Sequence, residues 1–158
     1  MIIDLSVRHK IRSAYERARP ILMKGIRLSP YDLGIDWFCL MSPIEDNVWD
    51  AIRFLGLPLY PQYPVGSYFV DFGDPFKRIG IEVDSIAWHM DRKKDIRRQK
   101  EIENMGWQIF RISSRMTYKS KPDFIREDDN GREILDVDKF ITQSAEGFLR
   151  KIYQGIKY

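Results

Sequence analysis

The sequence has one cysteine, Cys39, and two histidines, His9 and His89, among its 158 residues. A single cysteine excludes an internal disulfide and a zinc site built from cysteines. Two histidines exclude a histidine-rich metal cage. A catalytic metal, if the chain uses one, would therefore be held largely by carboxylates.

The sequence also lacks long apolar runs, internal repeats and low-complexity linkers. No run approaches the ~18 apolar residues of a membrane-crossing helix, and the N-terminus has no signal-peptide pattern. An apolar fraction of 44% predicts a folded domain, and a formal charge of +3 is a weak pointer to nucleic acid. We therefore expect a cytoplasmic protein, encoded by a bacterium, an archaeon or a phage, with no membrane association.

The pattern of elements predicts an N-terminal helical extension, residues 1–41, followed by one domain, residues 42–158. The extension is expected to be helical over 4–24, with a kink or break at Pro20, and irregular afterwards. A second helix is expected to begin at Ser42, because Ser, Pro and Glu45 follow one another as in a capping box. Gly56 fits the position after its end.

Alternating strand material follows this helix. We predict strands at 68–72 and 78–84 joined as a hairpin, a charged helix at 91–105 and a strand at 107–112. A polar turn at 129–131 and a last helix at 137–156 complete the chain. The order predicts an α/β fold in which a mixed central β-sheet is flanked by helices.

Three carboxylates are expected to converge on the predicted hairpin. Glu82 and Asp84 are two residues apart, so both side chains point to one face of their strand. Asp71 lies on the partner strand. Neighbouring carboxylates repel one another, and a divalent cation such as Mg²⁺ or Mn²⁺ would remove that cost. The alternative is that these acids form only a solvated strand face, and the capping box alone would explain Glu45.

The segment that begins with Asp71, a turn and Glu82-Val-Asp84 resembles the metal-binding hairpin of the PD-(D/E)xK nucleases. In the order of its Glu82-Val-Asp84, Trp88-His89, Asp95, Arg98, Ile102, Gly106 and Arg111, it resembles the very-short-patch-repair-endonuclease-like branch, which includes uncharacterised bacterial domains and phage homing endonucleases. The resemblance covers about half the chain, from Ser42 to Ser113. It implies a restriction-endonuclease-like core and a metal-dependent DNA endonuclease.

The resemblance also implies roles for individual residues. Asp71, Glu82 and Asp84 would bind the metal, Glu45 would reach it directly or through water, and His89 would accept a proton from the attacking water. Two positions depart from the usual motif. Val70 stands in place of its Pro, and Asp84 stands in place of its Lys, or of a His in the repair branch.

The predicted charged helix carries a cluster of basic residues beside these acids. Such a cluster suits a DNA phosphate backbone, although a solvated helix face would look the same. We further expect Asp95 and Arg98 to pair with each other and support the site without binding the metal. The basic residues are Arg92, Lys93, Lys94 and Arg97.

The best prediction from the sequence is a DNA endonuclease, acting in repair or in phage DNA processing, that nicks or cuts both strands. Double-strand cleavage would favour a homodimer. One alternative is a catalytically inactive nucleic-acid-binding domain that keeps the nuclease fold. Another is a structural or interaction protein. The aromatic residues near the hairpin are expected to pack in the core, unless one or two wedge between bases.

Overall fold

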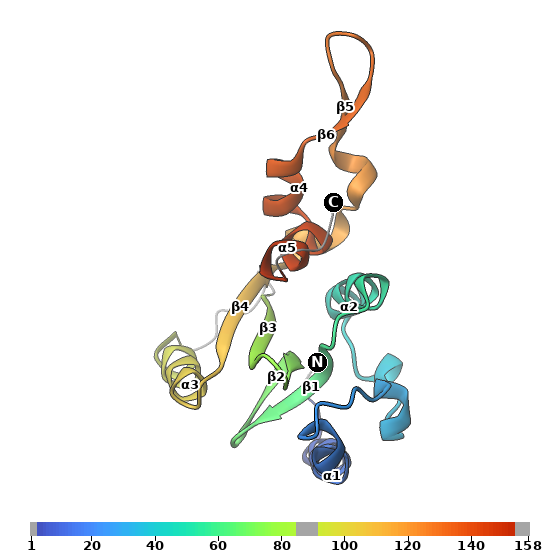
Figure 1. Cartoon of the computed structure of the whole chain (residues 1–158). Helices are drawn as coiled ribbons and strands as arrows, with labels where there is room; N and C mark the ends of the chain where they lie inside the picture. The colour runs from blue at the N-terminus through green and yellow to red at the C-terminus, as the bar shows by residue number, and fades with distance from the viewer. Residues whose placement is uncertain (1–2, 85–91, 154–158) are drawn as a thin grey trace. The chain divides into compact units, whose positions relative to one another are not determined.

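The computed structural model describes residues 3–84 and 92–153 (Figure 1). Their contacts divide the chain into two compact units. Unit 1 comprises Met1–Ser42, Pro58–Glu82 and Ala87–Arg111, and unit 2 comprises Pro43–Leu57, Val83–Ile86 and Ile112–Tyr158. Among the described helices, none is both long enough and apolar enough to cross a membrane.

A four-stranded sheet organises the fold, with its strands in the order β1, β2, β3, β4. β1 pairs antiparallel with β2, and β2 pairs antiparallel with β3. The first residue of β4 donates a backbone hydrogen bond from Gln108 N to Arg78 O, just before β3, so the two strands run in the same direction. The predicted mixed sheet and α/β fold are confirmed. The strands are β1 Tyr60–Val65, β2 Tyr68–Asp74, β3 Ile79–Asp84 and β4 Gln108–Ser113.

Strand β1 was not predicted from the sequence. It contains Pro61 and Pro64, which lack the backbone N–H that a central strand needs. β1 lies at the edge of the sheet, where only one side is paired and proline is tolerated. The edge position explains why a segment with two prolines can still be a strand.

The N-terminal extension forms helix α1, Leu5–Leu22, which packs along β1. Its buried face includes Ile11 and Tyr15, and the Tyr15 hydroxyl donates a hydrogen bond of 2.5 Å to Pro61 O. α1 continues through Pro20 and ends two residues later. The segment expected to be irregular contains two short 3-10 helices, Pro30–Leu33 and Trp37–Cys39.

Helix α3, Arg92–Asn104, packs against the same sheet through one apolar residue. Ile102 is fully buried and clusters with Val65 and Val70. Gly80 on β3 leaves room for this packing, because a Cβ there would lie 2.6 Å from Ile109 Cδ1 on β4. α3 is thereby held with its charged side chains near β2, β3 and β4.

The turn between β2 and β3 is held by a buried acid. Asp74 is fully buried, and its Oδ1 accepts backbone hydrogen bonds from Phe76 N at 2.8 Å and Lys77 N at 3.1 Å. These bonds satisfy two donors of the turn. Asp74 thus helps to set the register in which β2 and β3 pair.

Unit 2 contains helix α2, Pro43–Leu55, which begins and ends as predicted, with Gly56 at a φ of +62° after its last residue.

The predicted polar turn lies in a small antiparallel hairpin of β5 and β6. The expected single helix at 137–156 is wrong: residue 144 separates α4 from α5, and 154–156 lie outside the described residues. The remaining elements are the 3-10 helices Ser114–Tyr118 and Lys121–Phe124, β5 Ile125–Glu127, β6 Glu133–Leu135, α4 Val137–Gln143 and α5 Ala145–Ile152.

The break between α4 and α5 has a local cause. Ser144 has extended backbone angles, its hydroxyl donates to Phe140 O at 2.7 Å, and it accepts from Gly147 N at 3.0 Å. The serine thus closes one helix and caps the next.

Gly147→Ala is expected to destabilise this helix pair. A Cβ at Gly147 would lie 2.3 Å from Phe140 O and 2.6 Å from Phe140 C, which are backbone atoms that cannot rotate away. The clash should lower the free energy of unfolding by about 2–3 kcal/mol. Urea denaturation would measure it. An Ala variant as stable as the parent would show that the close approach of α4 and α5 is wrong.

Candidate metal and nucleic-acid site

Two of the predicted acids meet at the pairing of β2 with β3. The register places Phe72 opposite Ile81 and Gly73 opposite Gly80. One position further along each strand come Asp71 and Glu82, and the side chain of Asp71 lies close enough to Glu82 to lower the pKa of its carboxyl group.

Glu82 is a buried acidic residue. Only 9% of its surface is exposed, and burial raises the pKa of its carboxyl group above the ordinary value. Arg98, Arg111 and the hydrogen bond with Asp71 act in the opposite direction and lower that pKa, though by less than burial raises it. A cation at the Asp71–Glu82 pair would offset the cost of burying this charge.

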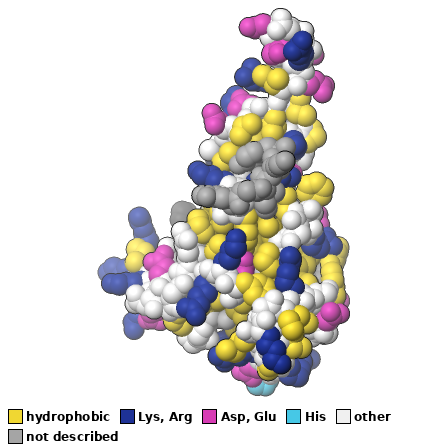
Figure 2. All heavy atoms as spheres, viewed as in Figure 1, with side chains coloured by type: hydrophobic (Ala, Val, Ile, Leu, Met, Phe, Trp, Pro, Cys, Tyr) yellow, Lys and Arg dark blue, Asp and Glu magenta, His cyan; other side chains and the backbone are white. Residues whose placement is uncertain are grey.

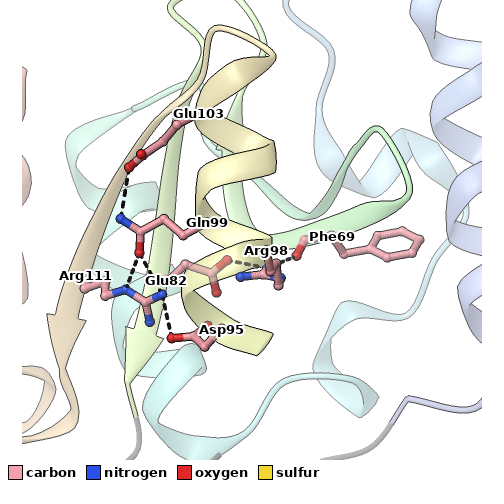
Figure 3. Close-up of polar contacts among 7 residues, drawn as sticks. All are labelled: Phe69, Glu82, Asp95, Arg98, Gln99, Glu103 and Arg111. Carbon is pink, nitrogen blue, oxygen red and sulfur yellow. Dashed lines mark hydrogen bonds and ion pairs between the residues drawn. The ribbon is translucent and has the colours of Figure 1, made fainter. Parts of the chain in front are cut away.

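Arg98 on α3 is the direct partner of Glu82. Its Nη2 donates to Glu82 Oε1 at 2.6 Å and to Phe69 O at 2.5 Å, so one guanidinium joins α3, β2 and β3 (Figure 3). The expected pairing of Asp95 with Arg98 is wrong. Spacing along the helix favoured a local contact, but Arg98 reaches the buried acid of a strand instead.

Asp95 is held by Arg111 of β4, which the sequence reasoning did not assign to the site. Arg111 Nη2 donates to Asp95 Oδ2 at 3.0 Å and to Gln99 Oε1 at 3.0 Å. Gln99 in turn donates to Glu103 Oε1 at 2.9 Å (Figure 3). A lone arginine within the apolar strand 107–112 was the signal that could have pointed to this network.

The remaining predicted acids, Asp84 and Glu45, belong to unit 2, whereas Asp71 and Glu82 belong to unit 1. Within residues 3–84 and 92–153, no group of three or more histidine, cysteine, aspartate or glutamate side chains is arranged to hold a metal ion. The predicted convergence of three carboxylates is therefore not found. Asp84 is exposed at the end of β3, and Glu45 lies in the first turn of α2 in unit 2. His89 lies outside the described residues.

The predicted basic residues form an exposed stretch of α3. Arg92, Lys93, Lys94 and Arg97 are all exposed, and Lys100 extends the series. Arg97 pairs with Glu101 at 3.1 Å, and Glu101 also accepts from the Tyr68 hydroxyl at 2.5 Å. In Figure 2, Lys and Arg side chains gather where Figure 1 shows α3.

The aromatic residues of the hairpin divide into two groups. Tyr60 and Phe72 are buried in the core, as expected. Tyr63, Tyr68, Phe69 and Phe76 are only half-buried. Their positions leave open the prediction that one of them wedges between bases.

The donor atoms at the Asp71–Glu82 pair suit a hard divalent cation. Carboxylate oxygens are the ligands that Mg²⁺ and Mn²⁺ prefer, and no soft sulfur or imidazole ligand is part of the pair. Asp71 and Glu82 would supply two of the ligands of such an ion.

These features define a class of fold and site: a mixed α/β sheet that carries a carboxylate pair, with a basic helix beside it. The family comparison agrees with this class. Residues 44–127, just over half of the chain, match the model of the restriction-endonuclease-like family REase_MTES_1575, and the chain belongs to that family.

Two individual proteins are also similar to the chain. The uncharacterized protein YcjD of Escherichia coli (strain K12) is 31% identical over 71 residues, which span 43% of this chain and 61% of YcjD. The catalytic domain of the homing endonuclease I-Bth0305I is 21% identical, with 47% of this chain and 78% of that domain covered. The TM-score of this match is 0.42.

Proposed function

We propose that the chain is a divalent-metal-dependent DNA endonuclease. The observation that carries the proposal is the meeting of Asp71 with the buried Glu82 in a chain of a restriction-endonuclease-like family. The exposed basic face of α3 supports DNA as the substrate, because phosphate contacts by Lys and Arg dominate DNA affinity. The closer relationship to the very-short-patch-repair branch stays a prediction.

In this proposal Asp71 and Glu82 hold Mg²⁺ or Mn²⁺, and Asp84 and Glu45 stay candidates for further ligands. The ion would act as a Lewis acid and lower the pKa of a bound water. Arg98 keeps Glu82 oriented by holding one of its oxygens, and Arg111 keeps Asp95 and Gln99 in place. His89 remains the candidate for the group that accepts a proton from the attacking water.

A plasmid assay tests the proposal. Supercoiled DNA is incubated with the protein in Mg²⁺, in Mn²⁺ or in a chelator, and nicked and linear products are separated. Metal-dependent products are expected, and a Glu82→Gln protein purified identically controls for contaminating nucleases. DNA binding without any cleavage would instead support the alternative of an inactive nucleic-acid-binding domain. Neither binding nor cleavage would reject both functions.

Removing a positive charge from the basic face of α3 should reduce the salt dependence of DNA binding. Lys94→Gln is expected to lower the slope of log affinity against log salt by about 1, the value of one lost phosphate contact. Arg97→Gln should lower it less, because Arg97 already pairs with Glu101. Fluorescence anisotropy with a labelled duplex measures both slopes. An unchanged slope for Lys94→Gln would remove α3 from the DNA-binding surface.

A further inference from the structure

Helix α1 lies outside the segment that matches the family model, which begins at residue 44. It nevertheless places two arginines against the strand that carries Asp71. The guanidinium carbon of Arg12 lies 4.8 Å from the centre of the Phe69 ring, and that of Arg8 lies 5.9 Å from it. Phe69 is two residues before Asp71 on β2.

Phe69 connects helix α1 with the Asp71–Glu82 pair. Its backbone oxygen accepts from Arg98, which also binds Glu82. Arg12 is fixed a second time, because its Nη1 donates to Gly66 O at 2.8 Å in the turn between β1 and β2. All these residues belong to unit 1, so their arrangement is defined within one compact body.

The arginine pair is placed to bind an anion. Among the residues that the structure describes, neither Arg8 nor Arg12 forms an ion pair with a carboxylate. A guanidinium that stacks on an aromatic ring directs its N–H groups outward in its own plane, where they suit a phosphate. Arg8 is exposed, and Arg12 is half-buried.

We propose that Arg8 and Arg12, held on Phe69, contact the phosphate backbone of DNA beside the Asp71–Glu82 pair. This inference rests on the proposed function and names a second phosphate-binding surface, on α1, in addition to α3. The two arginines lie on one side of α1, four residues apart. The surface would add affinity without reading the DNA sequence, because phosphates carry no base identity.

The test measures DNA affinity in the 158-residue chain with Asp71→Asn, so that cleavage does not interfere. A labelled duplex is titrated at several salt concentrations. Adding Arg8→Gln should lower the salt slope by about 1, and adding both Arg8→Gln and Arg12→Gln should lower it by about 2. At ~0.1 M salt each lost contact should weaken binding roughly eightfold.

Arg17→Gln is the matched control, because it removes the same charge from the same helix. Arg17 is exposed and lies nine residues after Arg8, about two and a half turns later and so on the opposite side of α1. Arg8→Gln keeps the Arg12–Gly66 bond, so its effect is separate from the docking of α1. Slopes for the Arg8 and double variants equal to that for Arg17→Gln would overturn this inference alone. No DNA binding by the Asp71→Asn parent would overturn the proposed function with it.

Discussion

Asp71→Asn is expected to reduce metal-dependent DNA cleavage by about 1000-fold, which corresponds to roughly 4 kcal/mol of transition-state stabilisation. The amide oxygen is a weaker ligand than a carboxylate, and the substitution removes half of the charge that the Asp71–Glu82 pair offers a cation. Folding should not suffer, because the Asn side chain can still donate a hydrogen bond to the neighbouring Glu82 carboxylate. Initial rates on supercoiled plasmid and the midpoint of thermal unfolding measure the two effects.

Asp74→Asn is the matched control on the same strand. Asp74 is fully buried, but its carboxylate accepts two backbone N–H groups of the β2–β3 turn. Asn can accept those bonds without the charge, so the expected result is a stability loss of about 1 kcal/mol with cleavage retained. If Asp74→Asn abolished cleavage while Asp71→Asn did not, the assignment of the two acids would have to be exchanged.

This contrast shows what the sequence could not resolve about the acids. Asp71 and Asp74 are three residues apart and equally plausible as ligands on composition alone. The structure of the β2–β3 turn shows that the Asp74 carboxylate accepts backbone hydrogen bonds, whereas Asp71 lies next to a second carboxylate. Alternation along β3 placed Glu82 and Asp84 on the face opposite Ile81, but it did not predict that Glu82 is only 9% exposed.

Residue spacing along helix α3 gave a wrong prediction of side-chain pairing, because contacts with the strands determine the pairs. The three-residue interval between Asp95 and Arg98 predicted a pair within α3, yet each residue binds a side chain from a strand. A buried carboxylate such as Glu82 is stabilised more by a cation than the half-exposed Asp95 is, and Arg111 on β4 takes the place of Arg98 as the partner of Asp95. Such an exchange depends on which strands lie under the helix, and helix periodicity does not contain that information.

The prediction of helices and strands from the sequence failed in a similar way for strand β1 and for the C-terminal helices. Prolines in 60–65 argue against a strand until the edge position is known. The continuous apolar periodicity after residue 137 favoured one helix, because the signal for a break is a single serine whose hydroxyl serves two helices. By contrast, the start of α2 at Pro43 and its end before Gly56 were predicted correctly from the capping residues in the sequence.

Arg98→Met is expected to destabilise the metal-free protein in a pH-dependent way. Arg98 is the direct cation partner of Glu82, and its removal leaves a carboxylate with a side chain only 11% exposed. Breaking a buried pair costs about 3–5 kcal/mol, and the lower end applies because the Arg98 side chain is 25% exposed. We therefore expect a loss of about 3 kcal/mol at about pH 8.

The loss should shrink as the pH falls. Burial already raises the pKa of Glu82 in the folded protein, and losing Arg98 removes the main influence that lowers it. A group with a raised folded pKa favours folding below its unfolded pKa, about 4.3 for Glu, and this contribution is lost as the pH rises through the folded value. Protonation of Glu82 is favoured more as the pH falls, so the two proteins should differ least at the lowest pH measured.

A double-mutant cycle separates this effect from lost packing. Glu82→Gln removes the charge that Arg98 compensates, so Arg98→Met in the Glu82→Gln background should cost well under the single-variant loss and show little dependence on pH. Urea denaturation in chelator at several pH values from about 4 to about 8 gives all four free energies. Equal losses in both backgrounds would mean that Arg98 stabilises the fold through its contact with Phe69 O and its aliphatic stem. The Glu82 charge would then be balanced chiefly by Arg111, whose guanidinium also lowers the pKa of that carboxyl.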